Sequence, residues 1–238
     1  MELRALWHGP ALATLSWSAA TIAAYLCARA VHRRWRRASP PPLVTSSLAL
    51  LAAAIVLHTS YHEYILATGW LLILLGPATV AFAVPIFEHR ALIVRHWAAL
   101  ALGMVAGSLT SMVSAWALAT LLGVDEQLRL SLLARSLSTP FAMEVSNTIG
   151  GAADLTALFV IATGLVGATL GELMLACLPI RSALARGALL GLGAHGMGTA
   201  KAHEVGGEEG TIAGLTMVLT GLLNVLAAPL IGAYARLL

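Results

Sequence analysis

The sequence predicts an all-α polytopic membrane protein, and three observations support this fold class. Of its 238 residues 59% are hydrophobic and only 11% are charged, whereas soluble domains carry about 25% charged residues. Apolar runs near the length that crosses a bilayer as a helix recur along the whole chain. The apolar–polar alternation that a membrane β-barrel needs is not present. We therefore expect about seven or eight membrane segments.

Residues 1–42 are expected to form an N-terminal membrane helix and a basic linker. Apolar residues fill the range 10–30, a basic cluster occupies 32–37, and Ser39 begins a proline-rich linker that ends at 42. Basic residues flanking a span indicate its cytoplasmic end. This places the N-terminus outside. The net charge of +3 comes largely from this cluster, so it indicates membrane orientation and no nucleic-acid partner.

Residues 43–122 form the first half of the expected repeat, with spans near 43–57, 70–87 and 97–122. The middle span contains Gly76, Pro77 and Pro85. Proline removes a backbone donor inside a helix, so this span is expected to be kinked or broken. The freed backbone groups must then face protein or water.

Residues 128–151 are predicted to form a re-entrant segment. This stretch is polar in its middle and carries Pro140. The turn at Asp125 is placed outside, and Arg181 and Arg186 are placed inside by the positive-inside rule. The span between these two points already supplies the single crossing that this requires. Residues 128–151 should therefore enter the membrane and return to the same side.

Residues 152–238 complete the second half, with spans near 153–178, 187–205 and 211–234. The last span brings the C-terminus, with Arg236, to the cytoplasm. The spans of the two halves then run in opposite directions, and each middle helix is interrupted by Gly or Pro. Inverted repeats with broken helices are a recurring design of transporters. We treat residues 1–238 as a single transmembrane domain.

The two interrupted segments predict a site for a small organic anion. Ser138, Thr139 and Pro140 have the pattern of a helix start, and Gly196 begins a second one. Free N–H groups at helix N-termini attract anions, and Lys201 adds positive charge. The predicted substrate-binding residues are Ser138, Thr139, Asn147, His195, Gly196, Gly198, Thr199 and Lys201. Glu144 is a proton-coupling candidate, because a carboxyl group in an apolar hairpin needs a partner such as Arg135.

Each of these residues also has a purely structural interpretation. Ser138 and Thr139 then only cap a helix, and His195 is a satisfied interior residue. Asparagines such as Asn147 and Asn224 then bridge helices, and Lys201 extends to the membrane surface. The sequence leaves both interpretations open.

Catalysis is not expected. The sequence lacks a nucleophile with a paired base, a zinc spacing such as H-E-x-x-H, and a phosphate-binding loop. We therefore predict that the protein is not an enzyme and needs no metal ion or cofactor.

Three motifs resemble the LrgB/CidB family over nearly the whole chain: Ser138 to Ser146 with Ile149-Gly150-Gly151, Ala194 to Ala200, and Gly76 to Ala81 with Pro85. The family's inner-membrane proteins were once described as antiholin-like regulators of murein hydrolases, and they work beside a small LrgA/CidA-like membrane protein. The C-terminal half of the plastidal glycolate/glycerate translocator is similar to them. This chain departs from many relatives in having Ser138 before Thr139-Pro140, and Lys201 where some have Arg.

The resemblance implies a multi-pass protein of the bacterial inner membrane. Its implied function is alternating-access transport of small monocarboxylates such as glycolate, glycerate or pyruvate. The alternative is an antiholin-like regulator of a holin-type partner, controlling murein hydrolase activity and lysis without a transport path of its own. The expected partners are a small organic anion, the LrgA/CidA-like protein and the lipid bilayer. A homo-oligomer is left open.

Overall fold

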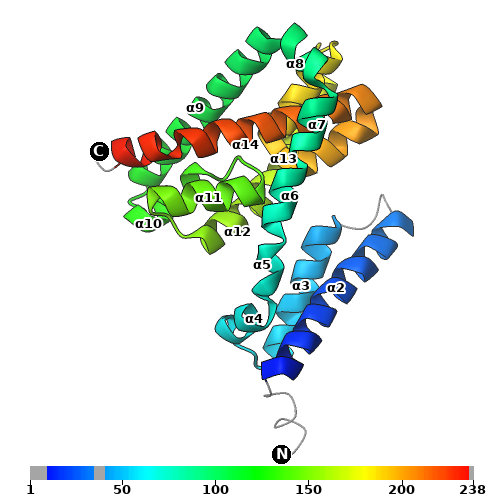
Figure 1. Ribbon diagram of the computed structural model, residues 1–238, viewed down its shortest axis with the longest axis vertical. Coiled ribbons are helices and arrows are strands. Elements are labelled where there is room, and N and C mark those ends of the chain that lie inside the picture. Colours follow the sequence, from blue (N-terminus) through cyan, green and yellow to red (C-terminus); the bar gives the residue numbers. More distant parts are fainter. Residues whose placement is uncertain (1–9, 35–40, 236–238) are drawn as a thin grey trace, which may run out of the picture. The chain divides into compact units, whose positions relative to one another are not determined.

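The computed structural model describes residues 10–34 and 41–235, and these ranges contain helices and no strand (Figure 1). The basic cluster beyond Arg34, the start of the proline-rich linker and Arg236 lie outside the described residues. The chain divides into two compact units, Met1–Pro77 and Ala78–Leu238. The all-helical prediction is confirmed, and the predicted organisation as one domain stays a prediction.

Unit 1 contains α2 (Pro10–Arg34), α3 (Pro42–Val56), α4 (Tyr61–Thr68) and α5 (Trp70–Ile73). Helix α2 packs against α3 and α4. The Trp17 and Tyr64 rings meet edge to face with their centroids 5.4 Å apart. Trp70 Nε1 donates a hydrogen bond of 2.8 Å to Ser18 Oγ. Aromatic residues therefore fix the packing of α2 within this unit.

Helix α6 (Leu75–Ala81) contains the boundary between the units, and α7 (Ala83–Glu88) and α8 (Arg90–Arg95) follow it. The span expected near 70–87 is therefore a series of short helices. Leu74 and Phe82 separate α5, α6 and α7. Pro77 and Pro85 lie within α6 and α7, which agrees with the loss of helical donors expected there.

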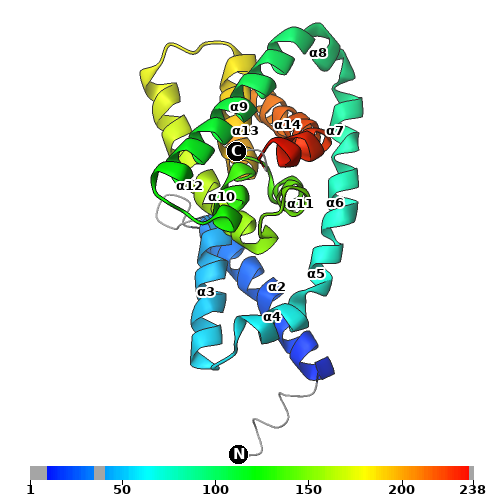
Figure 2. The same ribbon diagram turned by 90° about the vertical axis from the view of Figure 1, so that its left-hand side faces the viewer.

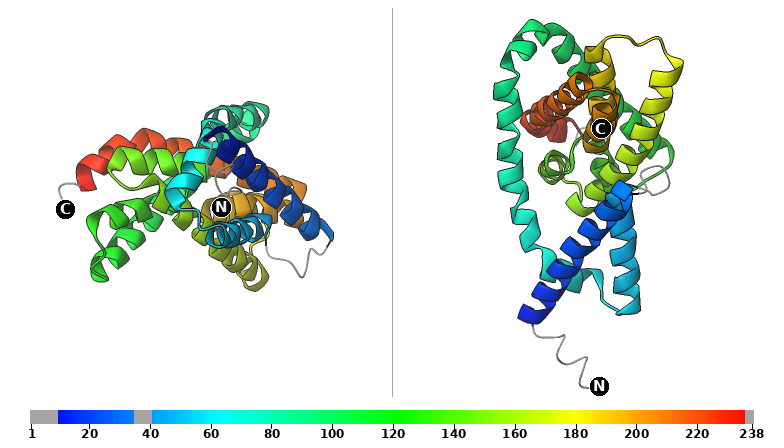
Figure 3. Two further views of the ribbon diagram at one scale, coloured as in Figure 1. Left: turned by 90° about the horizontal axis from the view of Figure 1, so that it is seen from below. Right: turned by 90° about the vertical axis from the view of Figure 1, so that its right-hand side faces the viewer.

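The rest of unit 2 consists of α9 (Trp97–Leu121), α10 (Glu126–Leu133), α11 (Thr139–Ile149), α12 (Ala153–Cys177), α13 (Ala183–Val205) and α14 (Gly207–Ala235). Helix α14 lies against α13 and α11 (Figures 1 and 2). Helices α12 and α13 are neighbours joined by a short connection, the yellow loop in the right-hand view of Figure 3. The largest buried apolar cluster includes Phe141, Val145 and Ile149 of α11, so α11 is the centre of this core.

Four segments are long and apolar enough to cross a membrane: Trp70–Glu88, Trp97–Leu121, Ala153–Cys177 and Gly207–Ala233. The chain is therefore a membrane protein with several apolar helices. Helix α11, with 11 residues, is roughly 16 Å long and shorter than the roughly 30 Å hydrocarbon core. Its re-entrant course, the count of seven or eight segments, the inverted repeat and the orientation of the termini stay predictions.

Candidate functional site

The first interruption lies between α10 and α11. Helix α10 ends at Leu133, and the chain becomes helical again at Thr139, with Ser138 as the N-cap residue and Pro140 in the first turn. The predicted helix start is confirmed. Ser138 has extended backbone angles, but its side chain accepts no capping hydrogen bond. Helix α11 ends at Gly150, whose φ of 96° is the left-handed conformation that favours glycine.

The second interruption lies inside α13, at His195. This residue has φ 39° and ψ −119°, so two helical stretches meet there. A residue eight positions further along a straight helix lies roughly 12 Å away. Here a methyl group built on Gly198 would overlap the carbonyl oxygen of Leu190. The bend is therefore sharp. Gly198 is needed because the stretches of α13 before and after His195 touch at this position.

Glycines of α12 make room for the bend in α13. A Cβ on Gly164 would lie 2.8 Å from His195 Cε1, and one on Gly171 would lie 2.7 Å from Leu190 Cδ2. A Cβ on Gly167 would overlap the carbonyl oxygen of Gly193. These glycines recur at helical spacing, so one face of α12 carries no side chains where α13 bends.

A buried hydroxyl network holds α10, α11 and α12 together. The Thr156 hydroxyl lies 2.7 Å from Ser146 Oγ and 3.0 Å from the Ser131 carbonyl oxygen. Ser131 Oγ accepts a 2.8 Å hydrogen bond from the Ala152 amide. Because all three hydroxyl-bearing residues are fully buried, the network fixes α10 and the C-terminal half of α11 against α12.

The two interruptions meet, since the buried His195 ring hydrogen-bonds with the backbone of Arg135. Three buried polar atoms around this crossing have no hydrogen-bond partner in the described chain: Ser138 Oγ, His195 Nε2 and Thr220 Oγ1. Buried polar groups in folded proteins are nearly always hydrogen-bonded. Unpaired atoms at this place therefore indicate a site for water or a polar ligand.

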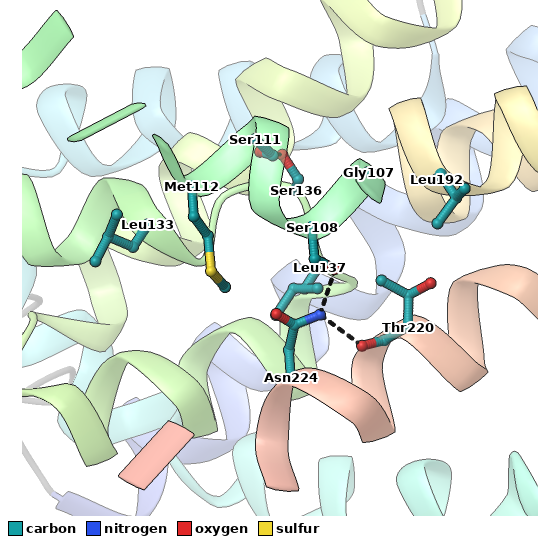
Figure 4. A pocket seen from close by; sticks show the side chains of 10 residues that line it. All are labelled: Gly107, Ser108, Ser111, Met112, Leu133, Ser136, Leu137, Leu192, Thr220 and Asn224. Carbon is teal, nitrogen blue, oxygen red and sulfur yellow. Dashed lines mark hydrogen bonds between the residues drawn. The ribbon is translucent and has the colours of Figure 1, made fainter. Parts of the chain in front are cut away.

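A small cavity of about 10 Å³ lies beside the crossing, between α9, α13, α14 and the chain around Ser136 (Figure 4). Asn224 of α14 donates 2.8 Å hydrogen bonds to Ser108 Oγ of α9 and to the Thr220 carbonyl oxygen. The bridging interpretation of Asn224 is therefore confirmed. Ser111 of α9 and Ser136 share a hydrogen bond between their hydroxyls, so polar side chains tie α9 to α14 and to the chain around Ser136.

A larger open hollow of about 490 Å³ shares Gly107, Ser111, Ser136 and Leu192 with this cavity. It is lined by Ala106, Gly107, Thr110, Ser111, Arg135, Ser136, Leu189, Leu192 and Gly193. The sequence interpretation missed this hollow and its α9 wall. It considered Arg135 only as a partner for Glu144. An arginine directly before a helix start was the signal in the sequence that could have identified Arg135 as a site residue.

The predicted site residues lie in three different surroundings. Ser138, Thr139, His195 and Gly198 lie at the crossing, and Thr199 donates a 2.9 Å hydrogen bond to the His195 carbonyl. Gly196 is exposed at the bend. The others lie apart: Asn147 and Glu144 are exposed on α11, and Lys201 pairs with Glu172 at 2.9 Å and with Glu204 at 3.3 Å.

The suggested Arg135–Glu144 pair is not formed among the described residues. Glu144 is exposed, and Arg135 Nη1 lies 3.5 Å from Ser136 Oγ. The described residues also contain no group of three or more His, Cys, Asp or Glu side chains placed to hold a metal ion. The site is therefore built from hydroxyl groups, backbone, one imidazole and one guanidinium.

The comparison with known families decides the membership of the chain. The model of the LrgB-like family matches residues 21–234. The chain belongs to the LrgB-like family. YwbG of Bacillus subtilis (strain 168) is 36% identical over 209 residues, which cover 88% of this chain and 93% of YwbG. YxaC of the same organism is 35% identical over 211 residues, 89% of this chain and 92% of YxaC.

A protein of Staphylococcus epidermidis (strain ATCC 35984) named "Holin-like protein CidB" is 27% identical over 211 residues, with 89% of this chain and 92% of CidB covered. No solved structure matches the chain. The resemblance to the LrgB/CidB family is thus confirmed. Since LrgB-like proteins are membrane proteins with holin-like members, the family gives no support to an enzymatic activity.

Proposed function

We propose that this chain is a membrane component of a holin-like system and that unit 2 lets a small organic anion bind and pass within that system. The two parts rest on different observations. The holin-like part is supported by the CidB relatives, which are named holin-like proteins. The anion part is supported by the geometry of the crossing, and the relatives' names carry no monocarboxylate.

The observation that carries the anion part is the meeting of two helix interruptions at unpaired buried polar atoms. Buried polar groups are nearly always hydrogen-bonded, so the unpaired Ser138 Oγ, His195 Nε2 and Thr220 Oγ1 support a polar ligand or water at this place. Broken helices at membrane depth are tolerated where they line a cavity. An open hollow of about 490 Å³ lies beside them.

The site favours an anion because it is surrounded by hydrogen-bond donors and by one positively charged side chain, Arg135. Helix α11 begins at Thr139 with free amide groups in its first turn. Arg135 lines the hollow. Glycolate, glycerate and pyruvate are the substrates that the family resemblance implies, and all carry one carboxylate. Exchange of a small carboxylate by alternating access is the finer form of this proposal.

The holin-like part is also supported by apolar surfaces that a membrane partner could cover. A small LrgA/CidA-like membrane protein is the proposed partner, and exposed apolar residues on α9 and α12, such as Leu102, Val113 and Leu158, offer surfaces that lipid or a membrane partner would cover. On this proposal the chain regulates murein hydrolase activity and lysis through that partner.

Reconstitution tests the anion part, and complementation in cells tests the holin-like part. The purified chain is placed in liposomes with and without the small partner, and uptake of labelled glycolate is followed. We expect uptake above that of empty liposomes, and a loss of uptake in His195→Ala at unchanged amounts of folded protein. Absence of uptake in both preparations would exclude the anion passage. In a second experiment, His195→Ala is expressed in cells that lack the native protein. If uptake is absent and this variant restores lysis control there, only the holin-like part of the proposal remains.

A further inference from the structure

We infer that the hollow between α9, the α10–α11 connection and α13 selects ligands with a single negative charge, and that Arg135 is the residue that recognises this charge. The inference rests on the proposed anion passage and goes further, because it assigns the recognition to a residue outside the predicted set. It gives a physical reason, one unpaired guanidinium in the hollow, why the single charge of the proposed ligands should matter.

Arg135 is the one charged residue among the nine that line the hollow. Its guanidinium pairs with no carboxylate of the described chain, and its polar contact is Ser136 Oγ at 3.5 Å. Arginine is always charged and presents donors in a fixed fork that matches a carboxylate. A half-buried guanidinium without a counter-ion is therefore suited to a ligand that brings one.

The other described cations of α10 to α13 are engaged or lie in water. Arg129 stacks over the Trp116 ring with 4.2 Å between the guanidinium carbon and the ring centroid. Arg186 pairs with Glu209 at 3.5 Å, and Lys201 pairs with Glu172 and Glu204. Arg181 is exposed in the α12–α13 connection. Among these cations, only Arg135 is partly buried, lines the hollow and has a guanidinium that is not paired with a carboxylate.

The walls of the hollow define the rest of the ligand. Thr110, Ser111 and Ser136 bring hydroxyl groups near the guanidinium, whereas Ala106, Leu189 and Leu192 are apolar. The Ser111–Ser136 hydrogen bond holds one of these hydroxyls in place between α9 and the connection. A carboxylate beside a short chain that carries one polar group matches this arrangement.

The number of charges gives the selectivity. With one positive group in the hollow, a monocarboxylate forms a neutral complex. A dicarboxylate leaves one negative charge uncompensated in partly desolvated surroundings, which is costly. A neutral amide of the same shape leaves the guanidinium unpaired. The hollow should therefore rank ligands by charge before it ranks them by shape.

The test measures binding to the purified full chain in detergent micelles by isothermal titration calorimetry. Three probes of similar size are compared at neutral pH: glycolate, the neutral glycolamide and the dianion malonate. We expect glycolate to bind at least tenfold more tightly than either of the others, since only the monoanion pairs with the guanidinium and leaves no charge uncompensated. Equal binding of the three probes would overturn the inference without any variant.

Variants then assign the effect to Arg135. Arg135→Gln should weaken glycolate binding at least tenfold and leave glycolamide binding unchanged, and Arg135→Lys should fall between the wild type and Arg135→Gln. Arg181→Gln is the matched control, because it removes one exposed positive charge and should bind like the wild type. Size-exclusion profiles and melting temperatures verify folding, and if Arg135→Gln does not fold, Arg135→Lys and the three-probe ranking decide.

The outcomes separate this inference from the proposed function. If the wild type takes up glycolate and Arg135→Gln binds it equally well, the assignment to Arg135 is wrong and the anion passage stands. If the wild type neither binds nor transports any of the three probes, both are wrong.

Discussion

The two helix interruptions in unit 2 are made in different ways. The one before α11 is encoded in the local sequence, with Ser138 in an extended conformation and Pro140 in the first helical turn. The one in α13 contains no proline, and its central residue is a histidine at φ 39°. A non-glycine residue there is strained by about 1–3 kcal/mol. Its conformation must be imposed by its neighbours, above all by the glycine face of α12.

The difference shows that an interruption needs either local chemistry or tertiary packing, and that the two respond differently to mutation. Pro229 shows that a proline alone does not interrupt a helix, because it lies inside α14 and that helix continues through it. Changes in α12 should therefore disturb the bend at His195 strongly. Changes at the start of α11 should have effects that depend on single hydrogen bonds.

Gly167→Ala should have the largest effect, because it attacks the packing that imposes the bend. The new Cβ would overlap the Gly193 carbonyl oxygen and lie 3.1 Å from Ala194 Cβ, and backbone cannot move aside as a side chain can. We expect the free energy of unfolding to fall by about 2–3 kcal/mol, measured by SDS titration of the protein in mixed micelles.

Gly103→Ala in α9 is the control for Gly167→Ala, because the nearest atom to its new Cβ is Leu192 Cδ1 at 3.9 Å. It should leave stability unchanged or raise it by up to about 1 kcal/mol through helix propensity. Equal effects of the two substitutions would mean that α12 does not impose the bend.

Thr156→Val should have the next largest effect, and it acts on the first interruption. Valine keeps the shape of threonine but removes the hydroxyl that lies 2.7 Å from Ser146 Oγ and 3.0 Å from the Ser131 carbonyl oxygen. Leaving such buried groups unpaired costs about 1–3 kcal/mol. Thr169→Val on the same helix is the control, since that hydroxyl is exposed and bonds only within α12. A loss no larger than that of the control would contradict the role of the network.

His195→Gly and His195→Ala test the backbone strain directly. Both remove the imidazole, so their difference in stability reports the backbone alone. In an ordinary helix glycine is less stable than alanine by about 1 kcal/mol. At φ 39° the sign should reverse, with His195→Gly more stable than His195→Ala by about 1 kcal/mol. Thermal unfolding in detergent measures the difference.

Ala200→Gly, in the second arm of α13, supplies the ordinary helical reference and should be destabilised relative to the wild type. The same order at both positions, with glycine the less stable residue, would show that His195 is helical in solution and that α13 is a continuous rod.

Sequence reasoning found the start of α11 because capping and proline preferences act within a few residues. It placed a second helix start at Gly196, one residue after the observed break, since the glycine density marked the stretch. It could not show that the break lies at His195, because the cause is the face of Gly164 and Gly167 on another helix. The hollow was missed for the same reason: Thr110 and Ser111 of α9 reach Arg135 only through tertiary packing.

The number of spans was harder to predict than the helical class. Apolar content identifies α9, α12 and α14 as candidate spans. Helix α13 carries glycines and polar residues that serve the bend, and it does not meet the same measure of length and apolar composition. The residues that build a site in a membrane helix thus weaken the signal by which the helix is recognised.

Ser138→Ala should have the smallest effect on stability, and it tests whether Ser138 caps α11 or serves a ligand. Ser138 occupies the N-cap position of α11, yet its hydroxyl is buried and accepts no hydrogen bond from the helix. Removing it should change the free energy of unfolding by less than about 0.5 kcal/mol, whereas loss of a working cap costs about 1 kcal/mol. Ser182→Ala at the start of α13 is the matched control, because Ser182 Oγ accepts a 3.2 Å hydrogen bond from the Ala185 amide. If Ser138→Ala loses as much stability as Ser182→Ala in the absence of any anion, Ser138 is an ordinary cap. If it loses little stability but weakens glycolate binding, the hydroxyl is kept free for the ligand, and the start of α11 belongs to the site as well as to the fold.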